Sequence, residues 1–99
     1  MVLNVGPEAV AASAATEGGV GAGLTAGSVA ASAALTAVMP MGADLDSIQF
    51  AAALNAAGAS YLAAAGEHTA NRDLFAGSQN LAAATYAVTD AINNTTLAL

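Results

Sequence analysis

One short break between two helix-forming runs constrains the fold of this chain more than any other feature. The break is Met39-Pro40-Met41-Gly42-Ala43. Pro40 lacks the amide donor that a continuing helix needs and disfavours helical backbone at Met39, while Gly42 permits a tight reversal. Alanine, the strongest helix former, supplies 30 of the chain's 99 residues. The sequence therefore predicts an all-α fold, an antiparallel hairpin of two long helices.

The first helix begins at a proline. Pro7 suits the first helical position, where its missing N–H would be unpaired in any case, and Glu8 lies at the positive end of the helix dipole. The first helix is therefore expected over about residues 7–38, or 8–38 without the proline. The connecting loop is then expected over residues 39–44.

The second helix has its own start signal. Asp44 is a good N-cap, because its carboxylate can accept a first-turn N–H, and Asp46 adds favourable charge in that turn. This helix is expected over about residues 45–92. No apolar periodicity follows in Asn93-Asn94-Thr95-Thr96, so residues 93–99 are expected to form a loose tail. The whole chain, residues 1–99, is interpreted as a single domain.

An alternating four-three spacing marks one face of the first helix. It is a thin row of mostly small residues: Val10, Ala14, Glu17, Gly21, Leu24, Ser28, Ala31, Leu35 and Val38. A second row at four-residue spacing consists of Gly19, Gly23 and Gly27, which would let another backbone approach closely. Glycine is unfavourable inside a helix, so these positions need tertiary contacts.

Larger apolar residues of the second helix form two separate rows, which indicates two neighbours. One row is Phe50, Leu54 and Tyr61; the other is Leu74, Leu81, Val88 and Ile92. The hairpin has too few large side chains to offset the entropy cost of its own ordering, so the isolated chain is expected to be unfolded, molten or self-associated. Packing within the hairpin and against a partner is assigned to Val10, Leu24, Leu35, Phe50, Leu54, Tyr61, Leu74 and Leu81.

Charge and composition exclude several classes of protein. Seven acidic residues against one basic residue give a formal net charge of −6, which disfavours nucleic acid and anionic membranes. No cysteine is present, so disulfides and thiolate metal sites are excluded. A Sec signal peptide begins with a positively charged segment, but no Lys or Arg precedes Glu8, so no Sec signal peptide is expected. The uncharged stretches 18–43 and 47–66 are long enough to cross a bilayer, but they are rich in Ala and Gly and lack basic flanks, so no stable span is expected.

No catalytic or metal-binding set is visible, and neither an enzyme nor a cofactor is predicted. Residues 18–23 are rich in glycine but match no phosphate-binding pattern, and no strand precedes them. His68 is the only histidine, and no serine lies in a Gly-x-Ser-x-Gly turn. Tyr86 and Asp90 are four residues apart, so on a helix they present a ring and a carboxylate on one face.

Taken together, these motifs resemble the PE proteins of mycobacteria across nearly the whole chain. Pro7-Glu8 matches the Pro-Glu pair for which that family is named. Met41-Gly42-Ala43-Asp44-Leu45-Asp46-Ser47 resembles the family's loop, where Pro-Ala-Ala-Asp-Glu-Val-Ser is common, and departs from it after the capping Asp. Tyr86 and Asp90 correspond to the family's YxxxD/E export motif.

The resemblance implies a helical hairpin that pairs with a PPE protein as a heterodimer. Such pairs are kept soluble by an EspG-type chaperone, which binds the PPE subunit, and are exported by an ESX, or type VII, secretion system. Tyr86 and Asp90 would act with a WxG turn that the PPE partner supplies, because this chain has no Trp. The expected location is secreted or at the cell surface, after assembly in the cytoplasm.

Two other functions remain open at this point. A self-assembling hairpin of the WXG100 homodimer type would explain the apolar rows, although this chain lacks the WxG sequence. A membrane-active peptide rich in Ala and Gly is the third interpretation.

Overall fold

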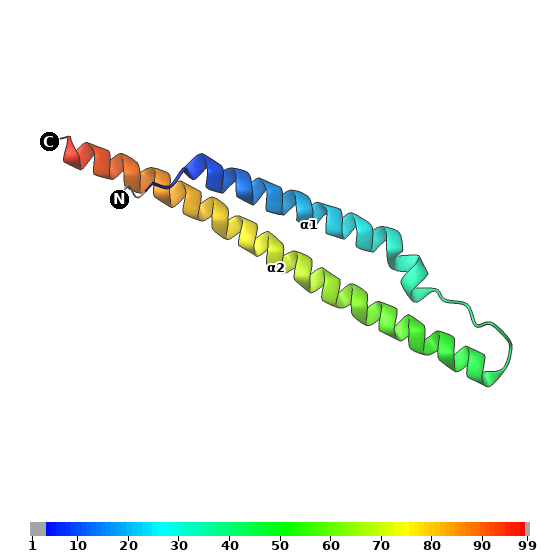
Figure 1. Cartoon of the computed structure of the whole chain (residues 1–99). Helices are drawn as coiled ribbons and strands as arrows, with labels where there is room; N and C mark the ends of the chain where they lie inside the picture. The colour runs from blue at the N-terminus through cyan, green and yellow to red at the C-terminus, as the bar shows by residue number, and fades with distance from the viewer. Residues whose placement is uncertain (1–3, 99) are drawn as a thin grey trace. The chain divides into compact units, whose positions relative to one another are not determined.

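The computed structural model of the chain describes residues 4–98 and contains two helices, α1 (Pro7–Thr36) and α2 (Leu45–Leu97). Figure 1 labels both helices. The two helices pack side by side in opposite directions. The predicted all-α antiparallel hairpin is therefore confirmed.

α1 starts at the proline and ends earlier than expected. The Gly6 carbonyl accepts hydrogen bonds from the amides of Ala9 and Val10, at 3.0 and 3.2 Å, so Pro7 is the first helical residue. At the other end, the Val38 N–H donates to Asn55 Oδ1 at 2.7 Å, and Asn55 Nδ2 donates to the Val38 carbonyl at 3.1 Å. The predicted end at residue 38 was two residues too late, because Asn55 of α2 binds the Val38 backbone.

Asp44 caps the start of α2. Its Oδ2 accepts the Ser47 backbone N–H at 2.9 Å, and its Oδ1 accepts the Ser47 hydroxyl at 2.8 Å. The Ile48 N–H bonds to the Asp44 carbonyl at 3.2 Å, which closes the first turn. The backbone and side-chain hydrogen bonds from Ser47 lower the pKa of Asp44 below its ordinary value of 3.8.

The cap makes the first turn of α2 depend on pH. The folded-state pKa of Asp44 is depressed, so the cap stabilises this turn above the unfolded pKa and loses its effect as pH falls through the folded pKa. We expect Asp44→Ala to fray the turn at about pH 6, and we expect wild type and variant to converge well below about pH 3. Amide chemical shifts and hydrogen exchange of Ser47 and Ile48 measure this. A difference that persists unchanged in acid would contradict the assignment.

α2 runs further than the sequence suggested. It continues to Leu97, five residues past the expected end at residue 92, so residues 93–97 are helical rather than a loose tail. Thr95 and Thr96 donate their hydroxyls to the carbonyls of Ala91 and Ile92, at 2.9 and 3.0 Å. Their polar side chains are thus satisfied without leaving the helix. Leu99, the last residue of the predicted tail, lies outside the described residues.

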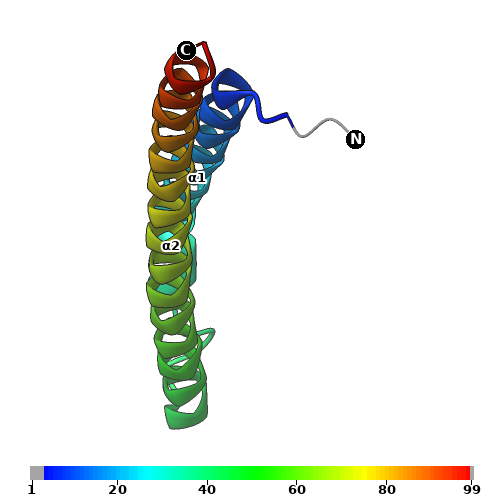
Figure 2. The same ribbon diagram turned by 90° about the vertical axis from the view of Figure 1, so that its left-hand side faces the viewer.

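By its contacts the chain divides into two compact units. The terminal unit is Met1–Val20 with Asn71–Leu99, and the central unit is Gly21–Ala70. In the terminal unit the start of α1 lies beside the second half of α2, whose last part extends past it (Figures 1 and 2). In the central unit the second half of α1 lies beside the first half of α2 (Figure 1). Each unit therefore contains one stretch of antiparallel helix pairing.

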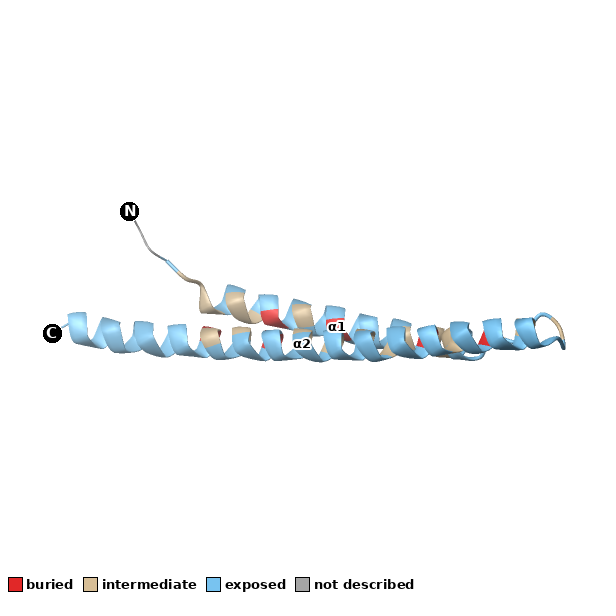
Figure 3. Cartoon of the chain, turned by 90° about the horizontal axis from the view of Figure 1, so that it is seen from below, coloured by how far each residue is buried: buried red, intermediate tan, exposed pale blue. Residues whose placement is uncertain are grey.

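Small residues form the contact between the helices in both units. Among the described residues, the buried apolar side chains are all alanines: Ala14, Ala51, Ala76 and Ala83. Figure 3 shows how few positions on either helix are buried. On α2 most of the buried and half-buried positions follow a four-three spacing, and we call the following set the α2 seam: Ala51, Asn55, Gly58, Leu62, Ala65 and Thr69 in the central unit, then Arg72, Ala76, Gln79 and Ala83 in the terminal unit.

The helices approach each other closely at one glycine of the central unit. A Cβ built on Gly58 would overlap the carbonyl oxygen of Leu35 on α1. By contrast, a Cβ on Gly19, Gly23 or Gly27 would meet nothing within 4 Å. The glycine row predicted to allow close contact therefore makes none within the hairpin. Gly58, which the sequence did not single out, has that role.

Candidate functional site

A second row of side chains on α2 is not covered by α1. In the central unit it contains Phe50, Leu54, Ala57, Tyr61, Ala64 and His68, again at four-three spacing. Each member directly precedes a residue of the α2 seam, so the two rows lie about 100° apart around the helix. We call this set the outer row. Its large members are exposed by 63% at Phe50, 41% at Leu54 and 61% at Tyr61. A helix with a covered seam and an uncovered apolar row has room for a second neighbour.

Two hollows lie along the outer row in the central unit. One, of about 320 Å³, is walled by Phe50 and Leu54 and by Val38, Met39 and Met41 of the loop. The other, of about 310 Å³, lies between the helices: Leu24 and Ser28 of α1 face Tyr61, Ala64, Ala65, His68 and Thr69 of α2. The Thr69 hydroxyl donates to the Ala65 carbonyl at 3.0 Å, so it does not seek a partner inside the second hollow. Both hollows suit apolar side chains.

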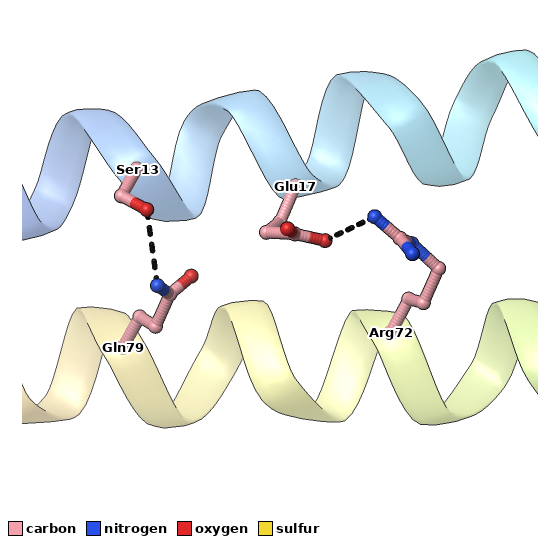
Figure 4. Close-up of polar contacts among 4 residues, drawn as sticks. All are labelled: Ser13, Glu17, Arg72 and Gln79. Atoms are coloured by element: carbon pink, nitrogen blue, oxygen red, sulfur yellow. Dashed lines mark hydrogen bonds and ion pairs between the residues drawn. The ribbon is translucent and has the colours of Figure 1, made fainter.

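Polar pairs set the register of the terminal unit. Arg72 Nη2 donates to Glu17 Oε2 at 2.7 Å, and Gln79 Nε2 donates to the Ser13 hydroxyl at 3.1 Å (Figure 4). The ion pair uses the chain's only Lys or Arg side chain. A fixed arginine fork and a carboxylate in a seam of small residues favour one helix register over others. The remaining acidic side chains therefore have no Lys or Arg side chain of this chain left to pair with.

The residues predicted for packing divide into two groups. Val10 and Leu35 are half-buried between the helices. Leu24, Phe50, Leu54, Tyr61, Leu74 and Leu81 are exposed by between 41% and 71%. The structure brings Leu24 and Tyr61 to one hollow and places Phe50 and Leu54 at the other. The large residues therefore contribute little to the hairpin itself, and their packing against a partner stays a prediction.

The sequence reasoning missed the residues that hold the hairpin together on α2. Gly58 and Asn55 make the close approach and the hydrogen bonds to the end of α1. Their signal was present, because the α2 seam repeats the four-three spacing that was noticed on the first helix. Apart from Leu62, its members are small or polar, and such residues do not stand out as an apolar row.

Tyr86 and Asp90 lie on the last part of α2, in the terminal unit. This part extends past the start of α1 in Figure 1. The two residues continue the four-three spacing of the α2 seam after Ala83, but Tyr86 is 45% exposed and Asp90 is exposed. Tyr86 borders a shallow hollow of about 390 Å³ with Leu81 and Thr85. The pair is thus accessible on a helical end.

Other candidate sites gain no support in the described part of the chain. No group of three His, Cys, Asp or Glu side chains that could hold a metal ion occurs among residues 4–98. Residues 18–23 are helical, so they form no phosphate-binding loop. His68 is exposed on the wall of the second hollow, and nothing beside it supplies a catalytic set.

Both helices are long and apolar enough to cross a membrane by length and composition alone, and little of either apolar stretch is buried. A helix that a partner covers meets the same criteria as a membrane span. The expectation of no stable span therefore stays a prediction.

The fold and the surface define a class: an all-α helical hairpin with a small-residue interface and an uncovered apolar row. The family model of the PE family matches residues 3–93, and the chain belongs to that family. The comparison with curated proteins found no match, and neither did the comparison with solved structures. As a kind, PE proteins are substrates of type VII secretion and not enzymes.

Proposed function

We propose that this chain forms a heterodimer with a PPE protein and leaves the cell through an ESX secretion system, with Tyr86 and Asp90 as its part of the export signal. Family membership supports the class of substrate. The outer row of α2 is the observation that carries the pairing. Two rows about 100° apart suit a helix of a four-helix bundle, which contacts two neighbours. α1 is one of them, and a partner helix is the other.

The exposed surface of the chain supports the same conclusion. It measures 7056 Å² for 9.4 kDa. A folded monomer of that mass exposes about 5,000 Å². The excess of roughly 2,000 Å² is of the size that one side of a large obligate interface buries. Pairing with another hairpin would bring this chain into the range of ordinary folded proteins.

Charge favours a different chain over a second copy. Two copies would bring two formal charges of −6 together, and the single Arg side chain already pairs with Glu17. Like charges across an interface oppose association, whereas a less acidic partner avoids this cost. An EspG-type chaperone would bind the PPE subunit and not this chain. It would act in the cytoplasm, before the pair is exported and is secreted or reaches the cell surface.

Co-expression tests the proposal. The chain is produced alone and together with a PPE protein, beginning with any that is encoded beside it. We expect a soluble one-to-one complex with a cooperative thermal transition, and an unfolded, molten or aggregated chain without the partner. A sharp cooperative transition of the purified monomer would contradict the proposal. A soluble homodimer would favour the WXG100-type alternative, and a requirement for detergent would favour the membrane-active peptide.

A further inference from the structure

The two hollows of the central unit share one geometry. On α2 the first is bounded by Ser47, Phe50, Ala51 and Leu54, and the second by Tyr61, Ala64, Ala65 and His68. Both sets have the spacing i, i+3, i+4 and i+7. Four helix residues at this spacing enclose the hole that receives one side chain of a neighbouring helix in knobs-into-holes packing. Each hollow is therefore shaped for a single large side chain.

The lining of each hole fits an apolar side chain. In both, the third of the four residues is alanine, Ala51 or Ala65, and larger residues flank it: Phe50 and Leu54 in the first, Tyr61 and His68 in the second. Leu24 of α1 adds an apolar wall to the second hole, and Met39 and Met41 add one to the first. Alanine leaves depth where a larger residue would fill it. The holes thus exist because these positions are small while their neighbours are not.

The two holes lie fourteen residues apart, since each residue of the first corresponds to one of the second: Phe50 to Ala64 and Leu54 to His68. Fourteen residues are two heptads, or about 21 Å of helix. Both holes therefore lie within about 40° of each other around α2, and one helix that wraps slightly around α2, as in a coiled coil, can enter both.

We propose that these holes are the sockets for two large apolar side chains fourteen residues apart on one helix of the partner. This inference rests on the proposed pairing and goes further, because it assigns the register and the anchoring residues. The occupant is a partner helix that is less acidic than this chain. Asp46 borders the first socket and Glu67 precedes His68, so a second copy would add acidic residues to an acidic surface.

A charge in the second socket tests the proposal. Ala64→Glu places a carboxylate on the wall of the socket from an exposed position outside the α2 seam. Ala63→Glu is the matched control, because Ala63 is also exposed and helical but borders neither hollow. Each variant competes with differently tagged wild-type chain for a limiting amount of co-expressed PPE protein, and mass spectrometry of the purified complex gives the ratio. We expect Ala64→Glu to be depleted by about tenfold or more, because pairing would bury its charge, and Ala63→Glu to match wild type.

Cross-linking tests the register. A photoreactive phenylalanine analogue replaces Leu54 or His68, which occupy the same place in the two sockets. We expect the two cross-links to fall about fourteen residues apart on one partner helix. Cross-links to different helices, or to another copy of this chain, would overturn the proposal, as would equal competition by the two Glu variants. If wild-type chain forms no complex with a PPE protein, the pairing itself fails; if the complex forms and these results are absent, only the sockets fail.

Discussion

Tyr86→Ala is expected to abolish export while leaving the helical pairing intact. Tyr86 is 45% exposed on an end of α2 that extends past the start of α1, and within the described residues its hydroxyl makes no hydrogen bond. Its ring is free for a receptor, and truncating an aromatic anchor of an interface typically lowers affinity by about 30- to 700-fold. Asp90→Ala is expected to act similarly, because its exposed carboxylate lies one helical turn away.

Immunoblots of culture filtrate and cell lysate measure export, and co-purification of the PPE protein measures pairing. Thr89→Ala is a suitable control, since Thr89 is exposed between the two residues of the motif. Asp90→Glu keeps the charge and should retain export, whereas Asp90→Asn removes it and should not. Loss of pairing in Tyr86→Ala or Asp90→Ala would instead make these residues structural. Normal export of both variants would show that Tyr86 and Asp90 are not part of the export signal.

Gly58→Ala is expected to be the most damaging single-methyl change in the hairpin. The new Cβ would overlap the Leu35 carbonyl, so α1 and α2 must separate locally. Overpacking of this kind costs about 1–3 kcal/mol or more, and the better helix propensity of alanine offsets only about 1 kcal/mol. The neighbouring contact between Asn55 and Val38 should weaken at the same time, because it depends on the same helix spacing.

Gly66→Ala provides the matched control. Gly66 is in α2 as well, but a Cβ there meets nothing within 4 Å, so only the helix propensity changes. We expect this variant to gain about 0.5–1 kcal/mol in the free energy of unfolding, while Gly58→Ala loses stability. Urea unfolding followed by circular dichroism measures the change in the free energy of unfolding for each variant, on the chain as it purifies with or without its partner. Equal gains in the two variants would show that the helices do not approach closely at Gly58.

Local signals in the sequence predicted most element boundaries. The first amide groups of a helix have no partner within the helix. Pro7 has no N–H that needs one, and Asp44 accepts the Ser47 N–H, so both start signals involve only neighbouring residues. The two errors lie at helix ends that other groups decide. α1 ends early because Asn55, seventeen residues away, binds the Val38 backbone. α2 ends late because Thr95 and Thr96 satisfy their hydroxyls within the helix.

The candidate surface was only partly predictable. Phe50, Leu54 and Tyr61 were recognised as a row because large apolar residues stand out in an alanine-rich helix. The assignment of that row to the outside of the hairpin needed the structure. Periodicity shows that two faces exist, but both faces of α2 repeat at the same spacing, so periodicity does not tell which one α1 covers.

The sequence by itself determined the two helices, the break at Pro40, the cap at Asp44 and the family, because each depends on local chemistry or on motif order. The tertiary structure alone decided which side chains lie between the helices. Backbones that come together at Gly58 leave room in the seam mainly for small residues such as Ala51 and Ala76. Once small residues fill that space, the large apolar residues must face outward, where the sockets and the uncovered row provide the surface for a partner.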